Sequence, residues 1–202
     1  MLIGLCGGSG SGKSTIIELL EEEFPGQIAV IDMDNYYISR DELPFEERRL
    51  VNYDIPESLD WNEMIGHIKE LKSGRTIRQP KFTFQTYERM KETEETRPAE
   101  ILIVDGIFSL HQEELCQLYD VKVFVDVPSE VRLRRRMLRN IERYGRTEEF
   151  EQKQFFEKVN PMHEKYVEPC RKLADVILPF ERRDRNEISM LIEVMKKKLK
   201  NK

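Results

Sequence analysis

The eight residues Gly7-Gly8-Ser9-Gly10-Ser11-Gly12-Lys13-Ser14 satisfy the pattern G-x-x-x-x-G-K-[ST], and the interpretation of the chain starts from them. A short apolar stretch at 2–6 precedes the motif and an amphipathic pattern at 13–24 follows it, as in a strand, a turn and a helix. Glycines let the backbone wrap around a phosphate, and the helix N-terminus favours an anion. We therefore predict a phosphate loop at 7–14, continued by Thr15, in which Lys13 reaches the terminal phosphates of a nucleotide and Ser14 binds Mg²⁺. A glycine-rich turn without a ligand is the alternative, and the flanking patterns argue against it.

Further strands and helices follow from the apolar patterns. Stretches at 28–31, 101–104, 121–127 and 174–178 are rich in β-branched residues, which is typical of buried parallel strands. Helical patterns occupy 61–72, 130–144, 148–166 and 185–199. Strands that alternate with helices predict an α/β fold of the P-loop NTPase type, a parallel β-sheet flanked by helices. We expect one domain over 1–202, with a small β-hairpin insertion at about 77–97 that joins the main sheet.

Composition excludes several classes of protein. The 202 residues carry a net charge of −5, so there is no overall basic field for nucleic acid. No apolar run approaches the roughly 18 residues that a membrane helix needs, and the N-terminus does not resemble a signal peptide. The three cysteines and three histidines are scattered, without the spacing of a zinc site or a disulfide framework. We expect a cytoplasmic protein that binds neither membranes nor nucleic acid.

Two carboxylates follow predicted strands. The stretch at 101–104 ends in Asp105, at the carboxyl end of its strand, where open α/β sheets bind their ligands. We predict that Asp105 joins Ser14 in holding Mg²⁺; a turn residue is the alternative. The segment Asp32-Met33-Asp34-Asn35-Tyr36-Tyr37 follows the stretch at 28–31. A carboxylate there could accept the proton of a substrate hydroxyl as its oxygen attacks the γ-phosphate.

An arginine-rich segment predicts a lid over the phosphates, at about 131–150. Residues 131–146 contain one acid, Glu142, and seven arginines: Arg132, Arg134, Arg135, Arg136, Arg139, Arg143 and Arg146. Helical spacing places four of them, Arg132, Arg136, Arg139 and Arg143, on one face. Guanidinium groups suit bidentate phosphate contacts and the charge of a transferring phosphoryl group. A solvated helix face and an RNA-binding stripe are the alternatives.

These motifs favour a small-molecule kinase over the other nucleotide-binding classes. A GTPase needs an N-K-x-D motif after a late strand, and the sequence has none. A motor is usually longer or carries partner-binding domains. A small-molecule kinase needs an acceptor pocket and a cationic lid, and both have candidates here.

The chain resembles the uridine kinase (uridine-cytidine kinase) family over nearly its whole length. The phosphate loop, DNYY, VNYDIPESLD, RMKET, LIVDGI, RRMLRNIERYGR, NPMHEKYVEP and ADVILP occur in the order and spacing of that family. The resemblance implies transfer of phosphate from ATP, or another nucleoside triphosphate, to the 5′-hydroxyl of uridine or cytidine with Mg²⁺, in pyrimidine salvage. It also implies a cytoplasmic homo-oligomer, commonly a tetramer.

The resemblance assigns roles to residues that match the family pattern. Asp34 becomes the base at the 5′-hydroxyl, Tyr37 lines the same site, and Asp54 accepts hydrogen bonds from the ribose diol. The lid residue Arg139 lies near the phosphates, joining Lys13 and Asp34 as the third catalytic group. The remaining substrate-binding residues flank the nucleoside or hold the base: Tyr53, Phe82, Phe84, Tyr87, Arg136, Arg146 and Gln154. Without the resemblance, Phe84 reads as a core residue and Asp54 as a turn acid.

The chain departs from the family pattern at four positions. Phe82 stands where a Tyr is frequent, Tyr87 where a His is frequent, and Asp105 where a Glu is usual. Tyr144 takes the place of the first arginine in R-G-R. We expect Tyr87 to favour cytidine, because a hydroxyl can donate to N3 of cytosine; packing against the hairpin, away from the base, is the alternative.

Two other functions stay open. The first is a P-loop kinase for another alcohol, such as a sugar phosphate or pantothenate. A sugar phosphate would require extra basic residues around Asp54 and 82–89, where the chain carries an acid and aromatic residues. The second is a nucleotide-binding regulator without turnover, and the presence of Asp34, Asp54 and the arginines argues against it.

Overall fold

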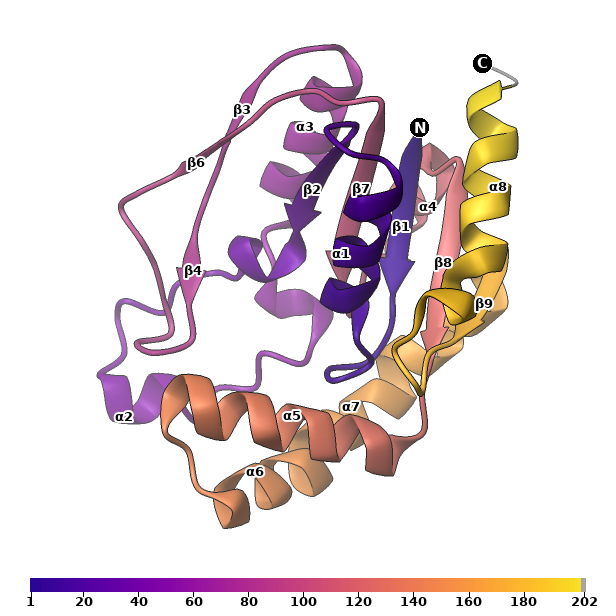
Figure 1. The fold of residues 1–202 in the computed structure, drawn as a ribbon. Coiled ribbons are helices and arrows are strands. Elements are labelled where there is room, and N and C mark those ends of the chain that lie inside the picture. The colour runs from indigo at the N-terminus through magenta and orange to yellow at the C-terminus, as the bar shows by residue number, and fades with distance from the viewer. Residues whose placement is uncertain (201–202) are drawn as a thin grey trace.

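Five parallel strands form the central sheet of the structure, a computed structural model that describes residues 1–200 (Figure 1). The strands are β1 (Leu2–Cys6), β2 (Ile28–Asp32), β7 (Ile101–Gly106), β8 (Val121–Asp126) and β9 (Val176–Pro179), in the order β2-β7-β1-β8-β9. The parallel sheet predicted from the sequence is therefore confirmed. The fifth strand includes Pro179, before which we expected it to end; as an edge strand, β9 tolerates a residue without an N–H donor.

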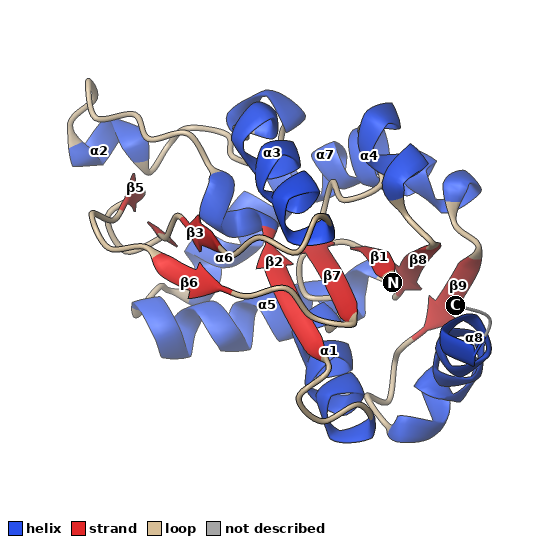
Figure 2. Cartoon of the chain, turned by 90° about the horizontal axis from the view of Figure 1, so that it is seen from above, coloured by secondary structure: helices blue, strands red, loops and turns tan. Residues whose placement is uncertain are grey.

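Helices cover both faces of this sheet (Figure 2). One face is covered by α1 (Lys13–Glu23) and α8 (Ser189–Lys200), the other by α3 (Trp61–Lys72) and α4 (Glu113–Leu118). Each face has its own core, with Ile16 and Met195 in the first and Met64 and Ile68 in the second. Successive side chains of a strand point to opposite faces of the sheet and therefore pack alternately into the two cores. Leu2 and Ile3 are an example.

The insertion at 77–97 forms two short antiparallel pairs. These are β3 (Ile77–Gln79) with β6 (Glu94–Thr96), and β4 (Phe82–Thr83) with β5 (Glu88–Arg89). The expectation that this hairpin joins the main sheet is wrong, since neither pair belongs to the five-stranded sheet. Side chains attach it instead: Arg89 donates hydrogen bonds to the carbonyl oxygens of Tyr36 and Tyr37. The hairpin therefore stands beside the end of β2.

The helix expected at 148–166 is interrupted. It consists of α6 (Glu148–Gln154), a π-helical segment (Phe155–Val159), α7 (Asn160–Met162) and a second π-helical segment (His163–Val167), with a 3₁₀ turn (Glu168–Leu173) after them. Pro161 has no N–H to donate, so the hydrogen bond that this residue would make to the preceding turn of a regular α-helix is missing. Further short elements are α2 (Phe45–Arg48) and 3₁₀ turns at Met33–Tyr36, Pro56–Ser58 and Arg185–Ile188.

The phosphate loop lies directly against the lid helix α5 (Ser129–Tyr144), which crosses below the carboxyl ends of the strands (Figure 1). A Cβ atom at Gly8 would lie 2.7 Å from Nη1 of Arg132 and from Nδ1 of His163, and one at Gly10 would collide with the carbonyl oxygen of Arg132. Gly10 also has a φ of 83°, which a side chain would strain. Glycine at both positions therefore lets the loop touch α5.

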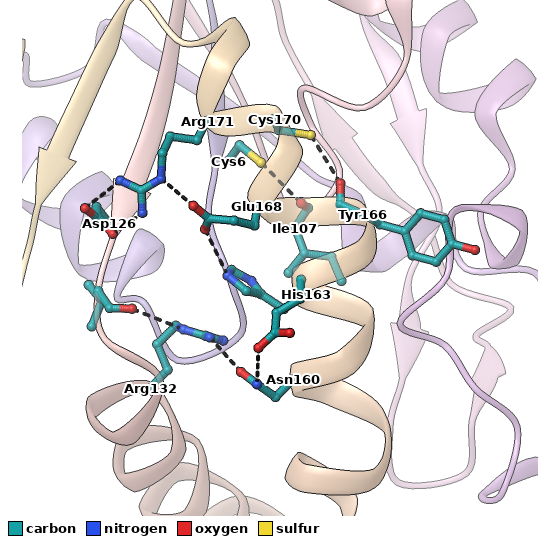
Figure 3. Close-up of polar contacts among 12 residues, drawn as sticks. Cys6, Ile107, Asp126, Arg132, Asn160, His163, Tyr166, Glu168, Cys170 and Arg171 are labelled. Atoms are coloured by element: carbon teal, nitrogen blue, oxygen red, sulfur yellow. Dashed lines mark hydrogen bonds and ion pairs between the residues drawn. The ribbon is translucent and has the colours of Figure 1, made fainter.

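Two sets of polar contacts, one at Arg132 and one at His163, lie next to the loop; Figure 3 shows both sets. Arg132, 3% exposed, donates to the carbonyl oxygen of Val127 and to Oδ1 of Asn160. Nε2 of His163 lies 3.5 Å from Glu168, and Arg171 joins Glu168 to Asp126 at the end of β8. Burial and, second, the charge of Arg132 lower the pKa of His163 to about 3. His163 is therefore a neutral support for the loop.

Because the folded protein keeps His163 neutral, the free energy of unfolding of the wild type should fall in acid. The variant His163→Gln should not show this part of the fall. The unfolded chain protonates His163 near pH 6.5, whereas the folded protein resists protonation down to about pH 3. The advantage of the wild type over the variant should be complete above pH 6.5 and shrink by about 1.4 kcal/mol per pH unit below it. Urea unfolding of both proteins at pH 8, 6 and 5 measures this change. A constant difference between the two proteins would contradict it.

Candidate active site

Three carboxylates meet beside the phosphate-loop lysine. Asp32 is the last residue of β2, and its register partner Asp105 is the last but one of the neighbouring strand β7. Asp32 accepts a hydrogen bond from the backbone N–H of Asp34 at 2.9 Å. Nζ of Lys13 lies 3.9 Å from Oδ1 of Asp105 and donates to the carbonyl oxygen of Gly7. Asp32 was not among the predicted site residues, although it follows an apolar stretch just as Asp105 does.

Burial makes these carboxylates easier to protonate. It raises the pKa of Asp105 to about 6, against the opposing effect of Lys13. It also raises the pKa of Asp34, although the charges of Lys13, Arg139 and Arg136 act in the other direction. The pKa of Asp32 is raised well above its usual range, first by burial and then by the charge of Asp34. One lysine therefore does not offset the clustered negative charge, and the cluster suits cations and proton acceptance.

The residues present fit a magnesium ion. Oδ1 of Asp105 is buried and has no hydrogen-bond partner, and Ser14 stands exposed in the first turn of α1. Within residues 1–200 there is no group of three or more His, Cys, Asp or Glu side chains arranged to hold a metal by themselves. Mg²⁺ commonly takes only one or two carboxylates and fills its shell with phosphate oxygens and water. Asp105 and Ser14 match that donor set.

Arginine side chains of α5 contact the phosphate loop on the side away from the three carboxylates. Nη1 of Arg136 donates to Oγ of Ser9 at 2.9 Å, and Nη2 of Arg139 reaches the same oxygen at 3.4 Å. The arginines expected on one face separate in the structure: Arg132 lies buried behind the loop and Arg143 is exposed. Arg135, which was not among the predicted site residues, donates to the carbonyl oxygen of Ser11. Two arginines therefore face the phosphate-binding side of the loop.

The candidate acceptor pocket, a name used here for Asp54 and the aromatic residues predicted with it, lies beside the carboxylates. Burial raises the pKa of Asp54, Arg136 opposes this rise and Asp34 adds to it, so the three groups share one electrostatic environment. Five predicted aromatic residues form one cluster with ring centroids 5.2–6.5 Å apart: Tyr37, Tyr53, Phe82, Phe84 and Tyr87. The structure thus unites residues far apart in sequence.

Tyr87 and Arg146 form the outer wall of the acceptor pocket. Nη2 of Arg146 donates to the Tyr87 hydroxyl, and the Tyr87 ring stacks on Tyr53 at 5.5 Å. Tyr87 has a φ of 58°, a strained conformation of the kind that often marks functional sites. A cavity of about 610 Å³, lined in part by Phe84, Tyr87 and Arg146, lies at this wall. Tyr144 packs on Arg146 at 5.0 Å.

Two predicted residues, Gln154 and Thr15, make no side-chain hydrogen bond to the other predicted residues within the described part of the chain. Gln154 ends α6 and is half-buried. Thr15 lies half-buried in the first turn of α1. The structure also adds a residue that no sequence signal indicated, Glu151, whose carboxylate is fully buried between Arg136 and Arg146.

Known proteins share both the sequence and the fold. The profile of the Phosphoribulokinase / Uridine kinase family matches residues 2–189. Uridine kinase of Clostridium novyi (strain NT) is 40% identical over 97% of this chain and 95% of its own. Uridine kinase of Macrococcus caseolyticus (strain JCSC5402) is 37% identical over 99% and 96%. Phosphoribulokinase from Rhodobacter spheroides, at 15% identity, superposes with a TM-score of 0.64 over 93% of this chain and 74% of that one. The resemblance found in the motifs is confirmed, and the chain belongs to the Phosphoribulokinase / Uridine kinase family.

Proposed function

We propose that the chain is an ATP-dependent kinase that phosphorylates the 5′-hydroxyl of uridine or cytidine, giving UMP or CMP. The observation that carries this proposal is the candidate acceptor pocket, in which Asp54 and a cluster of five aromatic rings lie close to Asp34 of the acidic cluster and to Arg136 of α5. Aromatic faces suit a flat base, and the two oxygens of a carboxylate suit the adjacent hydroxyls of a ribose. The relatives named uridine kinase support the same substrate class.

The charges of the site fit phosphoryl transfer. The 5′-oxygen forms a bond to the γ-phosphorus, the bond to the β–γ bridging oxygen breaks, and ADP leaves. Asp34, whose pKa is raised, accepts the proton of the 5′-hydroxyl. Lys13, Arg136 and Arg139 stabilise the charge on the transferring group. Asp105 and Ser14 would hold Mg²⁺, which neutralises charge on the phosphate oxygens when bound.

The nucleoside is held mainly by its ribose and its base. Asp54 accepts hydrogen bonds from the 2′- and 3′-hydroxyls, and the aromatic cluster packs on the base. Tyr37 lines the site between Asp34 and the base, while Arg146 and Gln154 border the nucleoside. Because the Tyr87 hydroxyl accepts a hydrogen bond from Arg146, its own proton stays available for the base.

The setting of the protein completes the proposal. No helix within residues 1–200 is long and apolar enough to span a bilayer. We propose a cytoplasmic enzyme that acts on a small molecule, needs neither nucleic acid nor a membrane, and assembles as a tetramer, as the family resemblance suggests. Pyrimidine salvage is the process such an enzyme would serve.

Substitutions should separate chemistry from binding. We expect Lys13→Ala and Asp34→Asn to lower kcat by about 10² or more, because each removes a group that acts on the reacting atoms. Asp54→Ala should chiefly lower kcat/KM for ribonucleosides. A coupled ADP-release assay on a panel of nucleosides, sugar phosphates and pantothenate measures both effects, with Asp41→Asn as an exposed carboxylate control.

Three outcomes of that assay would contradict the assignment. If the wild-type protein phosphorylates a sugar phosphate or pantothenate but no nucleoside, the proposed substrate is wrong. ATP binding without turnover of any acceptor would make it a regulator. Unchanged turnover by Asp34→Asn would remove the base from the mechanism.

Tyr87 should favour cytidine over uridine. Its free proton matches N3 of cytosine, an acceptor, whereas N3 of uracil is a donor. One unpaired buried polar group costs about 1–3 kcal/mol, or roughly ten- to a hundredfold in kcat/KM. We expect that preference in the wild type and a smaller one in Tyr87→His, since a neutral imidazole both donates and accepts. Steady-state kinetics with both nucleosides test this, and equal values in the wild type or an unchanged ratio in the variant would refute it.

A further inference from the structure

Glu151 is a fully buried carboxylate that accepts hydrogen bonds from three side chains. Oε1 accepts from Nη1 of Arg146 at 2.9 Å. Oε2 accepts from Nε of Arg136 at 3.2 Å and from Nδ2 of Asn140 at 2.8 Å. Glu151 is 0% exposed and Asn140 2% exposed, so water does not compete for these contacts. Such a carboxylate is stable inside a protein only where several donors satisfy it.

The three donors lead to two parts of the site. Arg136 continues to Oγ of Ser9 in the phosphate loop, and Arg146 continues to the hydroxyl of Tyr87 in the acceptor pocket. Asn140 accepts, through Oδ1, a hydrogen bond from Nε of Arg139, and Arg139 also reaches Ser9. One carboxylate therefore joins the phosphate side of the site to the base side.

The negative charge of Glu151 also reduces the repulsion among Arg136, Arg139 and Arg146. The three lid arginines converge within one small region, and like charges in a buried setting repel strongly. A carboxylate that binds two guanidinium groups directly offsets part of that repulsion and fixes both side chains in one orientation. An apolar residue at 151 would do neither.

We propose that Glu151 is a positioning residue that sets the lid arginines for phosphoryl transfer and couples their placement to the base-binding wall of Tyr87 and Arg146. This rests on the proposed function for its substrate, but not for the arrangement of the arginines around the phosphate loop. Glu151 touches no reacting atom in this scheme. Its effect reaches the phosphates through Arg136 directly and through Asn140 and Arg139 indirectly.

The test compares Glu151→Gln, Asn140→Ala and the control Glu149→Gln, an exposed acid of the same helix. Glu151→Gln should lower kcat at least tenfold and raise the nucleoside KM several-fold, because both ends of the network lose their acceptor. Asn140→Ala should lower kcat about tenfold with the nucleoside KM within twofold of the wild type, since it cuts only the link to Arg139. Glu149→Gln should match the wild type.

A fall in kcat without a change in the nucleoside KM, as expected for Asn140→Ala, distinguishes a positioning role of Glu151 from a purely structural one. Wild-type kcat in both Glu151→Gln and Asn140→Ala would overturn the proposal, as would an equal loss in Glu149→Gln. If Glu151→Gln does not fold, Asn140→Ala decides, because it leaves both ion pairs of Glu151 in place. A wild-type kcat in that variant would make Glu151 a structural charge partner only.

A second readout keeps this result apart from the proposed function. The rise in melting temperature caused by MgATP reports on the loop and the lid arginines without any acceptor. We expect a smaller rise in Glu151→Gln and Asn140→Ala than in the wild type. If the wild type binds MgATP but phosphorylates no nucleoside, the proposed function fails, and the MgATP shifts decide about Glu151. Equal shifts in all proteins would then refute its role.

Discussion

The direct contact between the phosphate loop and α5 is the constraint on which the site depends. Gly8 and Gly10 leave no side chain between loop and helix, so the backbone of the loop meets Arg132 and His163. That closeness lets Arg136 and Arg139 hydrogen-bond to Ser9. Without this close contact, the arginine side chains would have to become ordered each time a nucleotide bound, at a cost in conformational entropy.

The charges of the site form two opposed groups. The carboxylates Asp32, Asp34 and Asp105 gather where strands end, and burial raises the pKa of each. Arginines of α5 face them across the loop. In the proposed function, a nucleotide with its metal ion would supply both signs of charge and so satisfy both groups. The fold provides this opposition because parallel strands end at one edge and α5 passes below that edge (Figure 1).

Local sequence patterns predicted those parts of the protein that depend on local physics. Strand β1 was predicted at its observed bounds, and the glycine-rich turn after it, the strand that carries Asp105 and helix α5 were predicted from short patterns. Glu151 and His163 were missed because their significance comes from partners that only the tertiary structure brings together. The hairpin was misplaced for the same reason: side chains such as Arg89, rather than strand pairing, attach it. The acceptor pocket came from family resemblance, since its aromatic spacing is no different from that of a core.

The placement of the 5′-hydroxyl at Asp34 and of the ribose diol near Asp54 is the central claim. Its most direct measurement is the position of the new phosphate, by ³¹P and ¹H NMR of the product from uridine, together with kcat/KM for 2′-deoxyuridine. The site predicts phosphate on the 5′-oxygen alone and at least a tenfold lower kcat/KM for 2′-deoxyuridine, because one oxygen of Asp54 would lose its partner. Phosphate on another hydroxyl, or equal kcat/KM for the two nucleosides, would contradict this placement.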